Sequence, residues 1–349
     1  PIEYPTAAPI YSFVIIDLDS DRDLDIVAHQ PVDAVEGSTI ELMFNDGTGH
    51  FDTTETFEAP GIGRVFLHAA DVNGDGIEDL MVPSDARRLD TGGQRLQTLI
   101  SNGDGTFQLP PVIPQSEGFT GALAVGDING DQRDDIVATD SSGNHQAQLY
   151  LTDGERPFQE VKIDLPGPSL EVELADFDRD GHLDLAAAHG GALSISIGQG
   201  NGSFLPPQSL GLKAAAIEVG LFNDDAFPDL VVFEAGVPVQ SLNRLQILVG
   251  DGLGGFQSTQ WFVATGSFSS LRGMKTADLN RDGMDDFVLG TTRAGNSGQD
   301  YRIWLSQSDG THVLQPTLEA PGPGLSGFNL KDVDGDGTID LLAGRTGVR

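Results

Sequence analysis

Seven short acidic segments hold the residues of this chain that are best suited to bind a metal ion. In six of them, Asp occupies positions 1, 5 and 9 of a nine-residue pattern, and Asp or Asn occupies position 3. Alternate residues of a tight loop can turn their oxygens toward one centre, and calcium takes six to eight oxygen ligands. The pattern therefore predicts about six structural calcium ions, with side-chain ligands at positions 1, 3, 5 and 9 and a backbone carbonyl at position 7.

The predicted ligands occupy these five positions in each of the six segments. They are Asp17, Asp19, Asp21, Asp23 and Asp25; Asp71, Asn73, Asp75, Ile77 and Asp79; Asp127, Asn129, Asp131, Arg133 and Asp135; Asp176, Asp178, Asp180, His182 and Asp184; Asp278, Asn280, Asp282, Met284 and Asp286; and Asp332, Asp334, Asp336, Thr338 and Asp340. A further segment has Leu221 at position 1, then Asn223, Asp225 and Asp229. We expect it to bind calcium weakly or not at all. A single copy could equally be a solvated turn, but six copies favour metal binding.

The residues that follow each acidic segment exclude an EF-hand, which needs Glu at position 12 and flanking helices. Position 12 is apolar in all six segments: Ala28, Val82, Ala138, Ala187, Leu289 and Ala343. Each lies in a short apolar run directly after the ninth-position Asp. Such runs are typical of strands buried on both faces, so each acidic segment is expected to join two strands.

The rest of each repeat also indicates strands. A short run such as 122–126 precedes the acidic segment, and an alternating run such as 96–100 follows it. A Gly-rich turn such as 102–107 then leads to a fourth extended stretch. The first positions of successive segments are 45 to 57 residues apart. Four strands in each repeat of about fifty residues predict an all-β fold, a β-propeller, and no amphipathic helix is evident.

The acidic pattern resembles that of the FG-GAP/VCBS repeat family, whose best-known member is the seven-bladed propeller of integrin α subunits. The resemblance covers essentially the whole chain. It implies one seven-bladed domain over residues 1–349, with the calcium loops joining the innermost and second strands on one face. This chain departs from the family at Leu221, and at Arg22, Gln132 and Ala226, which replace Gly at position 6.

The two ends of the chain bear on how the ring closes. The seventh repeat reaches Arg349 just after its second predicted strand, which leaves the last blade incomplete. Residues 4–9 resemble the outer-strand exit at 57–60, so we expect the N-terminus to supply the outer strand of that blade and close the ring. A start at Pro1 without Met is consistent with processing or with a piece of a longer protein.

Composition limits the class of partner and the compartment. The formal net charge is −34, which argues against nucleic acid and anionic membrane surfaces as partners. No apolar run approaches the length of a membrane span. Cysteine is absent, so disulfides give no information about secretion. Calcium loops favour an extracellular or cell-surface location, where calcium is abundant.

Catalytic patterns are weak. The absence of Cys excludes a thiol nucleophile, and the seven His residues occupy different positions of the repeat. His29 and His189 both end the second strand of a repeat and could lie near one face, but we expect them to be loop histidines rather than catalytic or metal-binding ones. The acidic segments account for many of the carboxylates, so a glycosidase pair cannot be recognised.

The scarce basic residues suggest a binding face. Most connections that follow the second strand differ in length between repeats, and variable loops on a rigid scaffold commonly bind ligands. Arg suits bidentate recognition of carboxylates, although these side chains could equally be solvated surface groups. The residues concerned lie in or beside these connections or between blades: Arg87, Arg88, Arg95, Arg244, Arg293, Arg64 and Arg272.

These observations predict a calcium-stabilised extracellular binding module, lectin-like or adhesin-like, for a carbohydrate or an extracellular protein. The alternative is a polysaccharide lyase or glycoside hydrolase built on the same propeller. A third reading is a scaffold domain within a larger adhesin.

Overall fold

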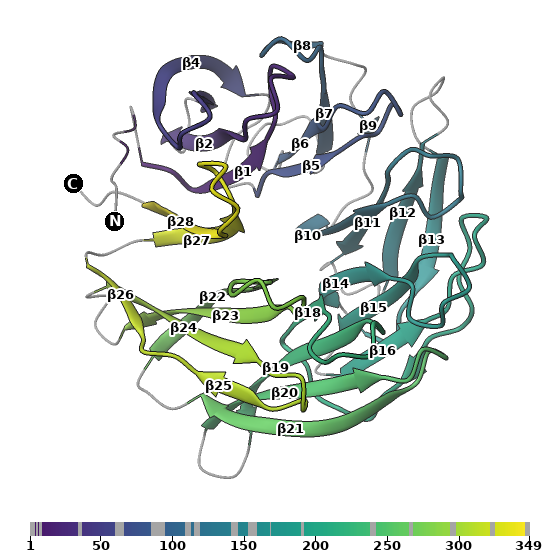
Figure 1. Cartoon of the computed structure of the whole chain (residues 1–349). Coiled ribbons are helices and arrows are strands. Elements are labelled where there is room, and N and C mark those ends of the chain that lie inside the picture. Colours follow the sequence, from purple (N-terminus) through teal and green to yellow (C-terminus); the bar gives the residue numbers. More distant parts are fainter. Residues whose placement is uncertain are drawn as a thin grey trace.

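The chain folds into antiparallel β-sheets arranged in a ring (Figure 1). The computed structural model describes residues 4, 6, 9–33, 37–59, 66–84, 95–108, 113–114, 119–140, 146–152, 159–167, 169–189, 192–237, 242–264, 268–293, 298–321 and 325–345. Within these residues all regular structure is strand, which confirms the all-β prediction. No helix in the described part is long and apolar enough to cross a membrane.

Six sheets are complete blades of four or five strands that follow one another in sequence. Blade 1 contains β1 (Ser12–Ile16), β2 (Asp25–Asp33), β3 (Gly37–Asn45) and β4 (Phe51–Ala59). Blade 2 contains β5 (His68–Ala70), β6 (Asp79–Ser84), β7 (Arg95–Ser101), β8 (Phe107–Gln108) and β9 (Ile113–Pro114). Blade 3 contains β10 (Phe119–Gly126), β11 (Asp135–Asp140), β12 (Gln146–Leu151) and β13 (Gln159–Asp164).

Blades 4 to 6 repeat the same order. Blade 4 contains β14 (Ser169–Ala175), β15 (Asp184–His189), β16 (Ala192–Ser196) and β17 (Gln208–Ser209). Blade 5 contains β18 (Ala216–Gly220), β19 (Asp229–Val237), β20 (Leu242–Gly250) and β21 (Phe256–Ala264). Blade 6 contains β22 (Phe268–Ala277), β23 (Asp286–Arg293), β24 (Gly298–Ser306), β25 (His312–Leu314) and β26 (Leu318–Pro321).

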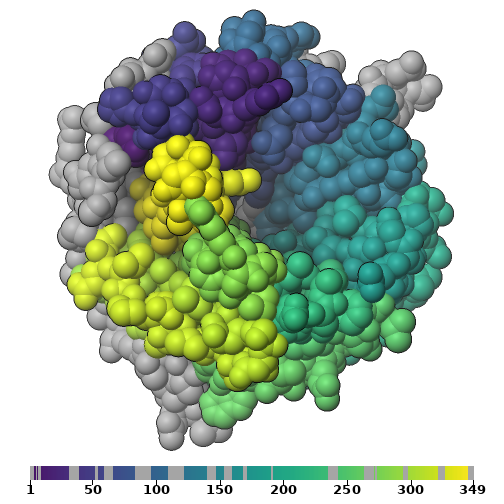
Figure 2. All heavy atoms as spheres, in the orientation of Figure 1, coloured from purple at the N-terminus to yellow at the C-terminus, as the bar shows by residue number. Residues whose placement is uncertain are grey.

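The seventh position in the ring holds a sheet of two strands, β27 (Leu325–Lys331) and β28 (Asp340–Arg345). Strand β27 contacts both β22 and β1, so this sheet lies between blade 6 and blade 1. Figure 2 shows the yellow C-terminal residues beside the purple N-terminal ones. The prediction of seven four-stranded blades is therefore not confirmed: six complete blades are present, because no further described strand pairs with β28.

The predicted closing strand at residues 4–9 is not confirmed either. Residues 5, 7 and 8 lie outside the described part, and Tyr4, Thr6 and Pro9 are not in a strand. Tyr4 nevertheless packs edge-on against Phe51 with ring centroids 5.0 Å apart, and its hydroxyl donates to the Gly49 carbonyl. The N-terminus therefore packs on blade 1.

The core is divided into layers between neighbouring sheets rather than gathered in one centre. Each second strand is apolar on both faces, so it packs against the blades on either side. All six residues of β15 are buried, for example, with Leu185 and Ala187 facing blade 3 and Ala186 and Ala188 facing blade 5. This double burial is what the continuous apolar runs predicted, and it fixes where each acidic segment ends.

Candidate metal centres

The seven acidic segments form loops that join the first strand of each sheet to the second. Position 6 has a positive φ in all seven loops, and position 4 in every loop except the fifth. The residues that replace Gly at position 6 keep this conformation, with φ of 79° at Arg22, 67° at Gln132 and 57° at Ala226. These side chains therefore occupy a backbone conformation that suits Gly.

Replacement of Gln132 by Gly should raise the free energy of unfolding by about 0.5–1 kcal/mol, because Gly adopts a positive φ without a Cβ clash. The side chain is exposed, and its backbone N–H would keep its bond to Asp127. Urea denaturation measures the change, with Gln132→Ala as the control that should show no gain. A Gly variant less stable than the Ala variant would contradict this explanation.

The first-position carboxylates organise the loops from within. Asp71 accepts hydrogen bonds from the backbone N–H groups of Gly74, Asp75 and Gly76 at 2.7, 3.1 and 2.8 Å. Position 6 donates to position 1 in all six loops that have Asp there. Leu221 cannot accept such bonds, and the fifth loop instead turns at Asp224 and Asp225. The departure at Leu221 therefore changes the loop's conformation as well as its ligand set.

The ninth-position carboxylates have a second role that the sequence did not reveal. One Asp135 oxygen accepts the Ile128 N–H at 3.0 Å, and the other accepts the Thr152 N–H at 2.8 Å. The same pair of bonds recurs in every complete blade, where it ties the loop to the end of the third strand. This Asp therefore joins three strands whether or not a metal is bound.

Burial of these ninth-position groups makes the charged form costly. It raises the pKa of Asp79 to about 7 and the pKa of Asp25 and Asp135 to about 6, although backbone N–H groups oppose the shift. Asp184, Asp229 and Asp286 behave in the same way, with pKa values raised by burial to about 6. A cation at the loop would favour the ionised form.

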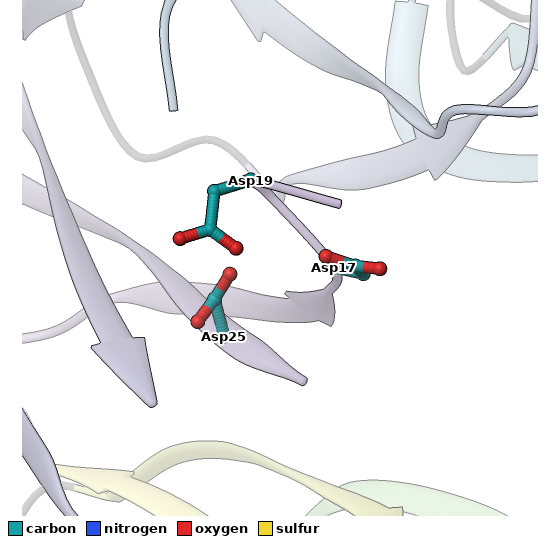
Figure 3. Close-up of side chains that lie close together, drawn as sticks. All are labelled: Asp17, Asp19 and Asp25. Carbon is teal, nitrogen blue, oxygen red and sulfur yellow. The ribbon is translucent and has the colours of Figure 1, made fainter. Parts of the chain in front are cut away.

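Three loops bring carboxylate oxygens close enough together to hold a metal ion. The oxygens within each group lie within 4.8 Å of one another, and the groups are Asp17, Asp19 and Asp25; Asp176, Asp178 and Asp184; and Asp332, Asp334 and Asp336. Figure 3 shows Asp17, Asp19 and Asp25 gathered at the loop between β1 and β2.

Unpartnered oxygens mark two of these groups. The Oδ1 atoms of Asp17, Asp19 and Asp332 are buried and accept no hydrogen bond from the described residues. Burial, together with the neighbouring Asp21 and Asp17, also raises the pKa of Asp19. Buried carboxylate oxygens without donors are costly, and a divalent cation is the partner that would satisfy several of them at once.

The other predicted ligands lie in the same loops. The loops that begin at Asp71, Asp127 and Asp278 have Asn at position 3, and among the described residues no trio of their carboxylates converges as closely. Two of the position 7 side chains, Asp23 and His182, pack closely against glycines of other turns. A Cβ atom added to Gly47 would lie 2.5 Å from Asp23 Oδ2, and one added to Gly200 would lie 2.3 Å from the His182 ring. At position 7, only the backbone carbonyl therefore remains available as the predicted ligand.

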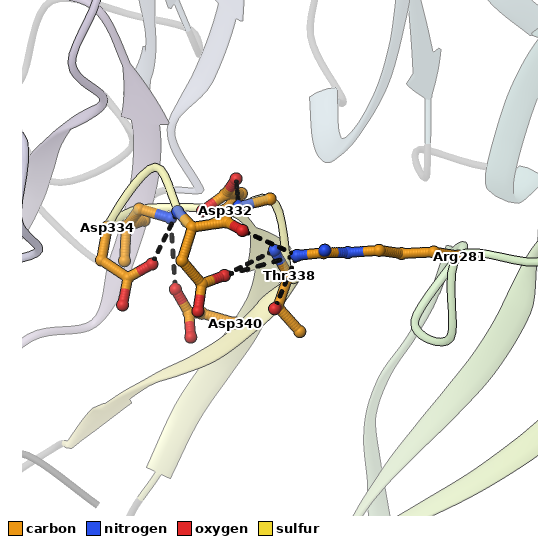
Figure 4. A network of polar contacts seen from close by, with 8 residues as sticks. Arg281, Asp332, Asp334, Thr338 and Asp340 are labelled. Atoms are coloured by element: carbon orange, nitrogen blue, oxygen red, sulfur yellow. Dashed lines mark hydrogen bonds and ion pairs between the residues drawn. The ribbon is translucent and has the colours of Figure 1, made fainter.

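Neighbouring loops are joined to one another, which the sequence analysis missed. Arg281 reaches from the sixth loop to the seventh, where it donates to the Asp336 carbonyl and Thr338 Oγ1, each at 2.8 Å (Figure 4). Arg133 Nε donates to the Asn73 carbonyl at 3.1 Å. Side-chain contacts therefore join the third loop to the second and the sixth loop to the seventh.

An additional Asp at position 8 makes a similar connection. Asp134 accepts the Asp71 N–H at 2.9 Å and donates its own N–H to the Asp71 carbonyl. Asp285 makes the same two contacts with Leu221. The consecutive Asp residues at positions 8 and 9 in the third and sixth repeats were the available signal.

The predicted Arg face can be assessed only in part. Arg64, Arg87 and Arg88 lie outside the described residues, and the side chains of Arg95 and Arg272 are not described. Arg293 pairs with Asp300 at 2.5 Å and Glu319 at 2.9 Å within its own blade. Arg244 lies 5.3 Å from the Trp261 ring centroid.

The two histidines singled out from the sequence are buried in blades. His29 is fully buried, neither ring nitrogen has a hydrogen-bond partner among the described residues, and burial lowers its pKa to about 4. His189 Nε2 lies 2.9 Å from Ser194 Oγ. The loop positions expected for both are therefore wrong, because each lies buried in the second strand of its blade.

The repeat pattern is shared with a known family. A family model described as FG-GAP-like repeat matches residues 17–82, 127–187, 176–232 and 278–343. These segments contain all six loops with Asp at position 1, and also the fifth loop. A comparison with curated proteins found no match to this sequence.

Solved structures with a similar fold serve diverse functions. An Agrocybe aegerita lectin, described as recognising non-reducing terminal N-acetylglucosamine, has 20% identity and a TM-score of 0.60 over 91% of this chain and 84% of its own. The periplasmic gluconolactonase PpgL of Pseudomonas aeruginosa has 15% identity and a TM-score of 0.60 over 99% and 91%. BBS1N in complex with ARL6DN has 11% identity and a TM-score of 0.60 over 96% and 89%. At these identities the likeness extends to the fold alone.

Proposed function

Because the chain belongs to the FG-GAP-like repeat family, we propose that it is a calcium-stabilised propeller that works as a binding module outside the cell or at its surface. Its ligand is a carbohydrate or an extracellular protein. Residues 1–349 form one domain in this proposal, and calcium is structural.

The calcium proposal is supported by the convergence of carboxylates at the first, fourth and seventh loops and by the unpartnered oxygens of Asp17, Asp19 and Asp332. Carboxylate, amide and backbone oxygens are ligands that calcium prefers. In the loops with Asn at position 3, the amide oxygen takes the place of one carboxylate oxygen.

The fifth loop provides a test of the ligand set. The wild-type chain should bind about six calcium ions, and Leu221→Asp should raise the number by one if the restored carboxylate suffices. Calcium per chain can be measured by elemental analysis after dialysis against calcium buffer. Asp225→Ala, in the same loop, is the control that should leave the wild-type count unchanged. A wild-type loop that binds calcium as tightly as the others would contradict the assigned role of position 1.

One observation favours a binding role: the connections opposite the acidic loops differ in length on a uniform scaffold. Because neighbouring strands are antiparallel, each second strand starts at the acidic face and ends at the other. There the connection to the third strand ranges from two residues between β15 and β16 to ten between β6 and β7. Variable connections on a rigid frame are where recognition commonly resides.

A carbohydrate is the ligand we favour. The lectin of similar fold is described as recognising non-reducing terminal N-acetylglucosamine, and the net charge of −34 disfavours nucleic acids and other strongly anionic partners. A glycan array probed in millimolar calcium tests this proposal. Binding of intact glycan supports it, whereas release of shortened products would favour the enzyme alternative, and no binding would favour a protein ligand.

The enzyme alternative is favoured by one group of side chains. Glu171 and Glu173 of β14, Glu218 of β18 and Lys275 of β22 lie on neighbouring inner strands, and Lys275 Nζ lies 2.6 Å from Glu218 Oε1. Burial raises the pKa of Glu171 to about 7 and that of Glu173 well above its usual range. A carboxylic acid protonated near neutral pH can act as a general acid, so Glu173→Gln is the variant to test if products appear.

A further inference from the structure

An exposed tryptophan stands on the outer strand of blade 5. The chain has two tryptophans: Trp304 is 3% exposed in the core, whereas Trp261 is 60% exposed. Trp261 lies in β21 directly opposite Gln246 of β20, which in turn lies opposite Val232 of β19. Val232 is buried in the layer between blades 4 and 5. The indole therefore stands on the face of blade 5 that points toward blade 4.

Neighbouring residues of β21 lie on opposite faces of blade 5. Phe262, the next residue after Trp261, points to the other face and packs on Phe287, Trp304 and His312 of blade 6. The two residues of β17, the outermost strand of blade 4, are themselves exposed. Trp261 therefore remains exposed on its face, whereas Phe262 is covered by blade 6.

Polar side chains surround the ring on the same face. The Arg244 guanidinium lies 5.3 Å from the indole centroid, and Glu234 is the cross-strand partner of Arg244. Gln246 donates a hydrogen bond to Ser258 Oγ and lies directly opposite Trp261. A flat apolar ring is therefore combined with a guanidinium, a carboxylate, an amide and a hydroxyl, all of which hydrogen-bond to sugar hydroxyls.

We propose that this platform, formed by Trp261, Arg244, Gln246 and Glu234, binds a neutral sugar residue of a glycan. The C–H face of a pyranose would stack on the indole, because Trp offers a rigid apolar surface with polar neighbours. Glu234, the cross-strand partner of Arg244, places a negative charge in the neighbouring strand, and the whole chain is strongly acidic. A neutral ring fits this environment better than a uronic acid or a sulfated sugar.

This inference rests on the proposed carbohydrate binding and locates that binding on blade 5. Trp304 is buried, so acrylamide quenching of tryptophan emission reports mainly on Trp261. Neutral probes are cellotriose, chitotriose and mannotriose in millimolar calcium, and polygalacturonate is the anionic probe. At least one neutral trisaccharide should lower the quenching constant about twofold or more by covering the indole.

Substitutions locate the site. Trp261→Ala should weaken binding of that trisaccharide about tenfold or more, as expected for removal of a central aromatic contact. Arg244→Ala should weaken it to a smaller extent. Leu253→Ala is the matched control, because Leu253 is 81% exposed in the turn of the same hairpin. It should change the affinity by less than about twofold.

The outcomes distinguish the proposed site at Trp261 from the broader proposal that the chain binds carbohydrate. Wild-type binding on a glycan array that persists unchanged in Trp261→Ala would overturn this site and leave carbohydrate binding intact. Failure of the wild-type chain to bind any glycan would overturn both. Binding of polygalacturonate alone, weakened by salt, would contradict the neutral-sugar assignment. Unchanged thermal melting of the Trp261→Ala variant would show that any loss arises at the surface rather than from unfolding.

Discussion

Chelation of calcium by EDTA should lower the melting temperature of this protein by roughly 10 °C or more, and added calcium should restore it. An ion that binds only the folded chain stabilises it by about 2.7 kcal/mol when its concentration is a hundred times its Kd. Two occupied loops would therefore supply about 5 kcal/mol. Differential scanning calorimetry in calcium and in EDTA measures the effect.

The effect of calcium should also depend on pH, because the ion competes with protons at the ninth position. The folded pKa values of Asp25, Asp79 and Asp135 are raised to about 6, 7 and 6 from the ordinary 3.8. The folded, metal-free chain thus binds protons at these three carboxylates more tightly than the unfolded chain does. The stability that this proton binding contributes is lost as the pH rises through 6–7. The difference in melting temperature between calcium and EDTA should therefore be larger at pH 7.5 than at pH 5.5.

Comparing calcium with EDTA at each pH removes the contribution of other titrating groups, such as the buried His29. Magnesium at the same concentration is a useful control, because it demands near-octahedral geometry and retains water ligands. A melting temperature that ignores EDTA at pH 7.5 would mean that the loops are acidic turns held by their own hydrogen bonds.

Asp135→Ala should lower the free energy of unfolding by about 2–3 kcal/mol even in EDTA. The substitution leaves the N–H groups of Ile128 and Thr152 without their partner. Each unsatisfied buried donor costs about 1–3 kcal/mol. The substitution also removes a buried carboxyl group whose ionisation is costly, which offsets part of the lost stability. We therefore expect a loss in the lower half of the combined range for the two unsatisfied donors.

Asp131→Ala is the matched control from the same loop. Asp131 is exposed, and among the described residues its carboxylate accepts hydrogen bonds from the Arg133 N–H at 3.0 Å and from the Asn129 side-chain amide at 3.3 Å. In EDTA it should cost less than about 1 kcal/mol, whereas in calcium it should also remove one bound ion. Urea denaturation of both variants in EDTA tests the difference. Equal losses would mean that position 9 acts solely as a metal ligand.

The sequence predicted the repeat unit and its chemistry because both depend on short-range spacing. Alternation of Asp with other residues over nine positions specifies a loop whose oxygens can converge, and the apolar run after Asp135 specifies a strand buried on both faces. The all-β propeller follows from repetition of that unit. Blade completeness was harder to predict, because whether a further strand pairs with β28 depends on contacts between segments far apart in the chain.

The different roles of the acidic positions within each loop could not be recognised from the sequence. All four acidic positions look alike there, yet Asp135 is bound by two backbone N–H groups, one of them from the end of the third strand. That assignment needs the register between strands. The Arg281 link to Asp336 and the Asp134 link to Asp71 likewise join segments more than fifty residues apart.

The sequence alone thus determined the fold class, the place of the acidic loops and the loop that departs from the pattern, because these features are encoded by residues close together in the chain. Only the tertiary structure decided which carboxylate oxygens are left unpartnered at Asp17, Asp19 and Asp332 and that Trp261 stands uncovered. Both outcomes depend on contacts between segments that are distant in the chain. No spacing within blade 5 encodes which of its outer side chains a neighbouring sheet covers.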